Sequence, residues 1–186
     1  MKTWHTPRHI AVAVLVIAGL ALVSARAGEV RLPIRDGETP ATTNRVPHIQ
    51  IGAKAVPRLS DRLLQRVGTL PGVKIRDTVI SLPGAKGFWL SENVDLARPQ
   101  AIVGGREFAH IHPDGSLHAS LPPDRAREAV KAGWAAMHPW ANSRPGWEGF
   151  VLLYTPRTVE ETDIVFQLLV DGYNFVTGRA HTAADL

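Results

Sequence analysis

One short segment near the middle of the chain, Arg106 to Leu121 (REFAHIHPDGSLHASL), constrains the fold more than any other. Its centre, Pro113-Asp114-Gly115, has the residues that a tight turn requires. Proline presets φ for the second turn position, aspartate suits the third, and glycine accepts the left-handed conformation that follows. The segment is therefore predicted to be a β-hairpin with a three-residue loop closed by a bulge glycine.

Side-chain alternation along the two strands gives this hairpin two unlike faces, because successive residues point to opposite sides of a strand. One face would carry His110, His112, Ser116, His118 and Ser120, with His110 opposite His118. The other face would carry Ala109, Ile111, Leu117, Ala119 and Leu121. A slip of one residue would bury imidazoles among aliphatic side chains, which disfavours any other register. We predict an apolar core face and a histidine face that is either a functional pocket or a solvated surface.

The N-terminal residues have the features of an export signal. Lys2 and Arg8 precede an apolar run from Ile10 to Val23, and Ala25-Arg26-Ala27 follows it. This pattern predicts a signal peptide over residues 1–27, cleaved after Ala27, and hence a periplasmic or secreted protein. The alternative is an uncleaved anchor that associates with a membrane through residues 10–25.

Charge and cysteine content exclude several classes of function. The chain has 21 Lys and Arg against 17 Asp and Glu, and three of the basic residues lie in the first 27, so the remainder has 18 against 17. Such a balance, without a basic run, argues against a nucleic-acid partner and favours a small-molecule substrate. The absence of cysteine excludes thiolate catalysis, disulfides and cysteine-based metal sites.

The rest of the chain predicts a single α+β domain with an antiparallel sheet and two or three packing helices. Residues 28–57 are expected to form an extended spacer, residues 58–178 the domain and residues 179–186 a tail. Helices are expected over 59–70, with Ser60 as N-cap, over 124–134, and from the Thr158 cap to about Phe175. Strands are expected within 73–82, 88–90, 101–103 and 150–154, and 137–147 is expected to be a loop.

The histidine face suggests two chemistries. Clustered imidazoles disfavour one another's protonation, and a neutral imidazole can act as a base. Alternatively, His-x-His with a facing histidine can supply three nitrogen ligands to zinc or non-haem iron. Carboxylates nearby are not obvious ligands, since Glu107 should point to the opposite face and Asp114 serves the turn. The residues alone leave both options open.

The segments REFAHIH, SLH, KAGWAAMHP (131–139), LLYTPR (152–157) and VEET together resemble the luciferase domain of fungal bioluminescence. The resemblance extends from Arg106 to roughly Tyr173, with the blocks in order. Compared with the fungal proteins the chain is shorter ahead of the hairpin, and its turn between His112 and Ser116 is tighter.

The resemblance implies oxidation of a hydroxylated styrylpyrone by molecular oxygen, with loss of carbon dioxide, emission of light and no added organic cofactor. It implies catalytic roles for histidines and for an arginine beyond the hairpin: His110, His112, His118, His138 and Arg157. Aromatic side chains are expected to contact the substrate: Trp134, Tyr154, Trp140 and Trp147. Trp134 and Tyr154 are more often core residues than ligand contacts, and Arg157 could instead pair with Glu160 or Glu161.

Three alternative functions are therefore considered for the chain. The first is a cofactor-independent oxygenase, acting on a small phenolic or enolic compound with a histidine base. The second is a zinc- or iron-dependent enzyme that uses the same histidines. The third is a non-enzymatic protein of the cell envelope that binds a small ligand.

Overall fold

The computed structural model describes Met1 and residues 31–186, and residues 32–186 form one compact unit. The expected signal peptide or anchor, including the apolar run 10–23, lies outside the described residues. Among the helices that are described, none is long and apolar enough to cross a lipid bilayer.

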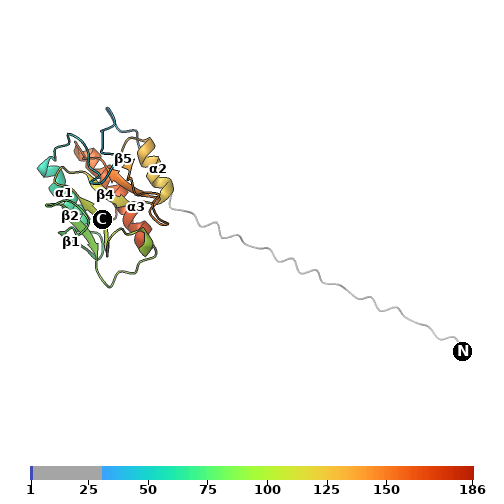
Figure 1. Cartoon of the computed structure of the whole chain (residues 1–186). Coiled ribbons are helices and arrows are strands. Elements are labelled where there is room, and N and C mark those ends of the chain that lie inside the picture. The colour runs from blue at the N-terminus through green and yellow to red at the C-terminus, as the bar shows by residue number, and fades with distance from the viewer. Residues whose placement is uncertain (2–30) are drawn as a thin grey trace. The chain divides into compact units, whose positions relative to one another are not determined.

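The unit is an α+β domain built on a six-stranded antiparallel sheet (Figure 1). Along the chain the elements are α1 (Pro57–Val67), β1 (Val73–Asp77), β2 (Lys86–Leu90), the 3₁₀ turn η1 (Pro99–Ala101), β3 (Glu107–Ile111), β4 (Leu117–Ser120), α2 (Pro123–Lys131), β5 (Ala135–Met137), β6 (Phe150–Leu153) and α3 (Val159–Thr177). The strands lie in the order β1-β2-β3-β4-β6-β5. The predicted fold class is confirmed.

The hairpin has the predicted loop and register. Its strands β3 and β4 pair His110 with His118, and the backbone N–H of His112 donates to the carbonyl of Ser116 at 2.8 Å. Gly115 has φ +84°, the left-handed value that the loop requires. A Cβ on Gly115 would also lie 2.9 Å from Cγ2 of Thr155, so both conformation and space call for glycine here.

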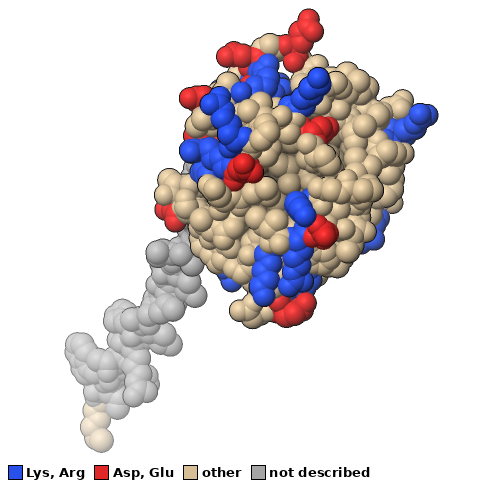
Figure 2. Space-filling view, turned by 90° about the vertical axis from the view of Figure 1, so that its left-hand side faces the viewer, with Lys and Arg blue, Asp and Glu red and all other residues tan. Residues whose placement is uncertain are grey.

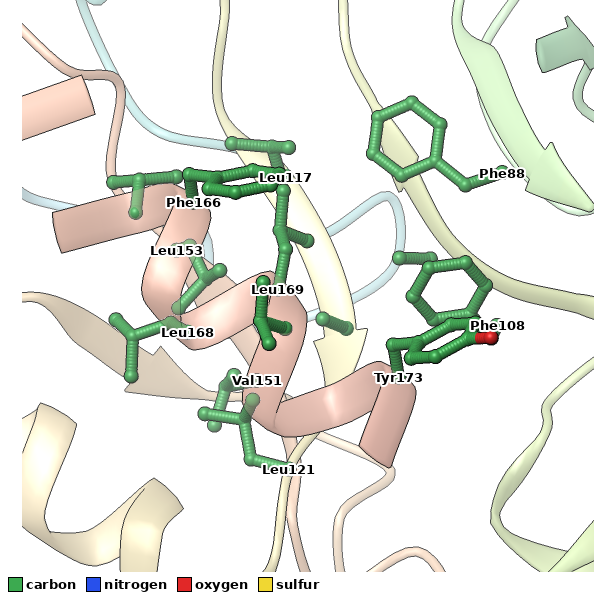
Figure 3. Packing of buried hydrophobic residues seen from close by; sticks show 14 of the residues in the cluster. Phe88, Phe108, Leu117, Leu121, Val151, Leu153, Phe166, Leu168, Leu169 and Tyr173 are labelled. Carbon is green, nitrogen blue, oxygen red and sulfur yellow. The ribbon is translucent and has the colours of Figure 1, made fainter. Parts of the chain in front are cut away.

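The apolar face of the sheet is covered by the last helix. Helix α3 contacts β3 and β4, and α1 packs on α3. Figure 3 shows Phe166 and Leu169 of α3 close to Leu117 and Leu153, and Tyr173 of α3 beside Phe108. The five side chains that the alternation assigns to the core are all buried in this cluster: Ala109, Ile111, Leu117, Ala119 and Leu121.

Helix ends follow local capping chemistry, although one start differs from the prediction. The Thr158 side chain accepts from the N–H of Glu161 at the start of α3, and Gly178 ends that helix with φ +74°. Helix α1 begins earlier than expected, at Pro57 after a Val56 N-cap, so Ser60 lies inside it. Proline at the first position needs no N–H partner, which explains the earlier start.

Two local predictions between the elements are wrong. Residues 101–103 form no strand, because the chain there leaves η1 and forms only an isolated bridge between Gly104 and Glu107. The α2 helix ends at Lys131, and Gly133 with φ +82° turns the chain into β5, an edge strand that includes Met137. Trp134 is therefore outside the helix that was expected to contain it.

Residues 32–56 pack on the domain, whereas the sequence suggested a spacer. The N–H of Arg35 donates to the carbonyl of Ala132 at 2.8 Å, and Nε1 of Trp134 donates to the carbonyl of Pro33 at 2.7 Å. Further along, a bridge between Thr42 and Gln50 closes a loop. Individual hydrogen bonds, and not a helix or strand, hold this segment in place. Its sequence therefore shows no hydrophobic periodicity.

Charged side chains are mixed on the surface. Figure 2 shows Lys and Arg beside Asp and Glu in small groups on one face of the molecule. That face carries no extended field of a single sign.

Candidate functional site

The histidine face of the sheet borders a cavity of about 300 Å³. Its walls come from the hairpin, from the loops at 46–49 and 80–82, and from the segment around His138. The lining residues are Val46, Pro47, His48, Ile49, Ile80, Ser81, Leu82, Val103, His110, His112, His118, His138, Trp140 and Phe150. The site thus combines aliphatic walls with a cluster of imidazoles, which is typical of small-molecule pockets.

The four histidines singled out by sequence lie together and are buried. His110, His112, His118 and His138 are each exposed by 5% or less. The ring of His118 lies at their centre, with its centroid 5.1 Å from His110, 4.8 Å from His112 and 4.8 Å from His138. These rings do not form a solvated surface, and they converge on one cavity.

A fifth histidine, His48, was missed by the sequence analysis. It is 3% exposed, stacks on His118 at 5.4 Å, and places its Nδ1 3.4 Å from Nε2 of His118. It lies in the loop closed by Thr42 and Gln50, within the segment expected to be a spacer. A single histidine among prolines and threonines has no pattern of its own, so only tertiary structure could assign it to the site.

Glu107 lies on the histidine side, which corrects the prediction that it points away. Between β2 and β3, Phe88 pairs with Ala109 but Trp89 pairs with Glu107, so Phe108 is the extra residue of a β-bulge. The bulge puts Phe108 and Ala109 both on the core face and reverses the alternation for Glu107. Its Oε1 consequently lies 3.0 Å from Nδ1 of His110.

Two further donors fix the Glu107 carboxylate. The hydroxyl of Thr78 donates to Oε1 at 2.7 Å, and the N–H of Val79 donates to Oε2 at 3.1 Å. Since a carboxylate only accepts, the 3.0 Å contact favours a hydrogen on Nδ1 of His110, with the lone pair of the neutral ring on Nε2. That Nε2 lies 3.1 Å from Nδ1 of His118.

A second polar chain orients His112. The hydroxyl of Ser116 donates to Oδ1 of Asp114 at 2.7 Å, so its oxygen is free to accept from Nδ1 of His112 at 2.9 Å. The lone pair of His112 is then on Nε2. Asp114 therefore serves both the turn, where it accepts from the Ser116 N–H at 2.9 Å, and the orientation of His112.

His138 has the opposite arrangement. The backbone N–H of Trp140 donates to Nδ1 of His138 at 3.0 Å. The hydrogen of a neutral His138 is therefore on Nε2, which can donate but cannot accept. The five rings of the cavity are thus not equivalent.

Burial disfavours the protonation of four of these imidazoles. Desolvation, followed by repulsion from His110, lowers the pKa of His112 to about 4. Desolvation and then repulsion from His48 lower the pKa of His138 to about 3. The pKa of His118 is well below its ordinary value, again because of desolvation and its neighbouring histidines, and burial lowers that of His48.

Two sets of three histidines are close enough to hold a metal ion. In each set the candidate nitrogen atoms lie within 4.8 Å of one another, and His118 belongs to both: His110, His112 and His118 form one, and His48, His118 and His138 the other. Neutral nitrogens without a hydrogen are what a metal requires.

The predicted aromatic wall is partly at the cavity. Trp140 lines it and is 42% exposed, and its ring stacks on Trp147 at 6.0 Å. Trp147 is buried behind that ring and does not line the cavity. The tight packing of Phe150 against His138, at 4.3 Å, completes the aromatic border.

The structure places Trp134, Tyr154 and Arg157 away from the cavity. Trp134 and Tyr154 are buried on either side of Arg35, whose guanidinium carbon is 5.7 and 5.6 Å from the two rings. Arg157 is half exposed and its Nε donates to Oε1 of Glu161 at 2.9 Å. Short-range pairing with Glu161, one of the two outcomes expected from sequence, is the one observed.

Comparison with known proteins agrees with this arrangement. The model of the Luciferase domain family matches residues 105–171, which contain the hairpin and His138. The chain is 29% identical over 167 residues to the luciferase of Armillaria mellea and 28% identical to that of Neonothopanus nambi. Each alignment covers 78% of this chain, and the chain spans 61% of the length of these relatives. No protein of solved structure matches. These matches support a fungal luciferase-like family for this chain.

Proposed function

We propose that the protein is an enzyme that binds a small phenolic or enolic compound in the histidine-lined cavity and oxidises it with molecular oxygen. The observation that carries this proposal is the pairing of His110 with the buried carboxylate of Glu107 at the border of an otherwise largely apolar cavity of about 300 Å³. Similarity to the Luciferase domain and to fungal luciferases supports the same class of reaction.

The proposed chemistry begins with proton removal. Nε2 of His110 accepts the proton of an enolic or phenolic hydroxyl, and Glu107 stabilises the positive charge that the ring acquires. His138, whose Nε2 carries hydrogen, is placed to donate a hydrogen bond to the resulting oxyanion. The carbon atom of the substrate anion that shares the negative charge then forms a C–O bond with O₂. The substrate is oxidised and O₂ is reduced to a bound peroxide anion, which takes the proton back from His110 and becomes a hydroperoxide.

Oxygen uptake by the full chain tests this proposal. The chain is incubated with a panel of hydroxypyrones, catechols and other enols in an oxygen-electrode cell, and each variant is compared on the compound that is consumed. The variant His110→Gln should lose at least about 100-fold in rate, because a general base contributes roughly that much. The matched control is His181→Gln, since His181 lies in the C-terminal tail beside Tyr173 and outside the cavity.

Two results would contradict the proposal. One is a compound that His110→Gln and the unmodified chain oxidise equally fast. The other is tight binding of panel compounds, measured by calorimetry, without oxygen uptake by any of them, which would favour a non-enzymatic ligand carrier.

A further inference from the structure

We propose that His110, His112 and His118 bind one divalent transition-metal ion at the border of the cavity. The inference rests on the proposed function only for the location of the reaction in the cavity. A metal ion held by these histidines, instead of the metal-free His110 ring, would then face the substrate oxygen.

The first argument is which nitrogens have lone pairs to offer. The 3.0 Å contact of His110 with the Glu107 carboxylate and the hydrogen bond of His112 with Ser116 favour a hydrogen on Nδ1 of each ring, which leaves the two Nε2 atoms without hydrogen. His118 presents Nδ1 to Nε2 of His110 at 3.1 Å, and its other nitrogen lies 3.4 Å from His48. When Nε2 of His118 donates to Nδ1 of His48, Nδ1 of His118 has no hydrogen and its lone pair faces that of Nε2 of His110. An ion between these two nitrogens would relieve the repulsion of the facing lone pairs.

The second argument is distance. Two nitrogens 3.1 Å apart that share an ion with bonds of about 2.1 Å subtend an angle of about 95°. That angle is closer to octahedral than to tetrahedral coordination, which favours Fe²⁺ or Co²⁺ over Zn²⁺. All three nitrogens lie within 4.8 Å of one another, so ring movements of roughly 1 Å would bring them onto one ion.

The third argument is the outer set of carboxylates. Histidine ligands of metals donate their other ring N–H to a carboxylate, carbonyl or water, which fixes the ring and raises its basicity. Nδ1 of His110 lies 3.0 Å from the Glu107 carboxylate, and His112 reaches Asp114 through the Ser116 hydroxyl. Both acidic groups add negative charge around an ion that three neutral imidazoles leave uncompensated.

The competing set of His48, His118 and His138 does not meet the same requirement. Nδ1 of His138 already accepts the Trp140 N–H, and its Nε2 carries hydrogen. His138 could ligate only by losing that backbone hydrogen bond or by becoming an imidazolate. Among the described residues, the hairpin set can therefore bind an ion without losing a backbone hydrogen bond; the ion would replace the contact between His110 and His118.

A metal at the hairpin set would act on the substrate hydroxyl as a Lewis acid. Coordination stabilises the oxyanion, so no imidazolium has to form among five buried rings. The two rings outside the set, His48 and His138, would remain to contact the substrate through hydrogen bonds.

Titration with Co²⁺ alone tests the inference without any substrate. The full chain is treated with a chelator, dialysed, and titrated with Co²⁺ while visible absorption and heat are recorded. We expect saturation at about one ion per chain, with visible bands of cobalt bound by nitrogen. His118→Ala should abolish this binding, whereas Glu107→Gln, which removes no ligand, should weaken it about 10- to 100-fold.

Matched variants keep the test independent of folding. His138→Ala and His181→Ala each remove one histidine outside the set and should bind Co²⁺ as the unmodified chain does. Circular dichroism confirms that each variant is folded, and if His118→Ala is not, Glu107→Gln and His138→Ala decide the matter.

The inference is overturned if Co²⁺ does not bind, if Glu107→Gln binds it unchanged, or if His138→Ala abolishes binding. Oxygen uptake separates this failure from that of the proposed function. Undiminished oxygen uptake by chelator-treated protein would contradict the metal site and support His110 as the base. Stoichiometric Co²⁺ binding without oxygen uptake for any compound would support the metal site and contradict the proposed function.

Discussion

The two faces of the β3–β4 hairpin are made by alternate residues of the same nine or so positions, yet their chemistry is opposite. Leu117 and Ala119 are fully buried against α3, where packing alone determines their contribution. His118 and Ser120, their immediate neighbours, are buried almost as completely but make directed polar contacts. Burial by itself therefore does not distinguish the core from the site.

What distinguishes the faces is how each tolerates a change of charge. The core face has no group in this hairpin that can gain a proton, while the histidine face has three rings within about 5 Å of one another. The core face should therefore determine folding stability and the histidine face should determine function. Substitutions on each face can test this division.

The largest expected effect on folding is on the core face. Leu117→Ala should lower the free energy of unfolding by about 2–5 kcal/mol, because it leaves a cavity beneath α3. Its neighbour His118→Gln should cost less than about 1.5 kcal/mol while abolishing oxygen uptake and Co²⁺ binding. Urea unfolding of both variants measures the difference, and equal losses would break the distinction between the faces.

The next effect is a dependence on pH that belongs to the histidine face. The folded pKa of His112 is about 4 and that of His138 about 3, both below the ordinary 6.5, so the unfolded chain binds more protons. Stability of the metal-free chain should then be complete above about pH 6.5 and fall as the pH drops toward 4. His112 alone should account for a loss of on the order of 3 kcal/mol in the free energy of unfolding over this pH range.

Unfolding midpoints between pH 7.5 and 4.5 measure this loss. The variant His112→Asn should show a shallower decline, and Leu117→Ala should show the same decline as the unmodified chain from a lower starting point. A His112→Asn profile parallel to that of the unmodified chain would rule out His112 as a source of the acid sensitivity.

A smaller effect is expected from Gly87, on the strand next to the hairpin. A Cβ there would lie 2.7 Å from Cδ of Glu107 and 2.7 Å from Nε1 of Trp89, so Gly87→Ala must displace the carboxylate from His110. We expect about a 10-fold loss in oxygen uptake, comparable to other changes around a positioned ligand or base. Thr69→Ala, on an exposed turn, is the control, and full activity of Gly87→Ala would show that Glu107 has no part in the site.

The smallest effect is expected from Arg157. Its side chain is half exposed and pairs with Glu161, which also accepts from Arg35 at 3.1 Å. Arg157→Ala should therefore change the unfolding free energy by about 1 kcal/mol or less and leave oxygen uptake within roughly twofold. A large loss of turnover with unchanged stability would return Arg157 to the catalytic residues.

The hairpin was predictable because turn chemistry and alternation agree over residues 109–121. Glu107 was not, since a one-residue bulge at Phe108 reverses the alternation and nothing in the sequence marks it. His48 lies beyond the reach of periodicity for a similar reason, in a loop defined by contacts distant in sequence. Arg157 was predictable from a local rule, because Glu161 lies four residues further along the chain and pairs with it.

The origin of the cavity walls has a consequence for how this protein could change. The hairpin and the segment around His138 supply most of the reactive imidazoles, whereas the loops at 46–49 and 80–82 supply most of the aliphatic wall. Loops tolerate substitution and insertion better than paired strands do. Selectivity for the bound compound can therefore change by exchange of these two short segments, while the histidines of the hairpin keep their positions.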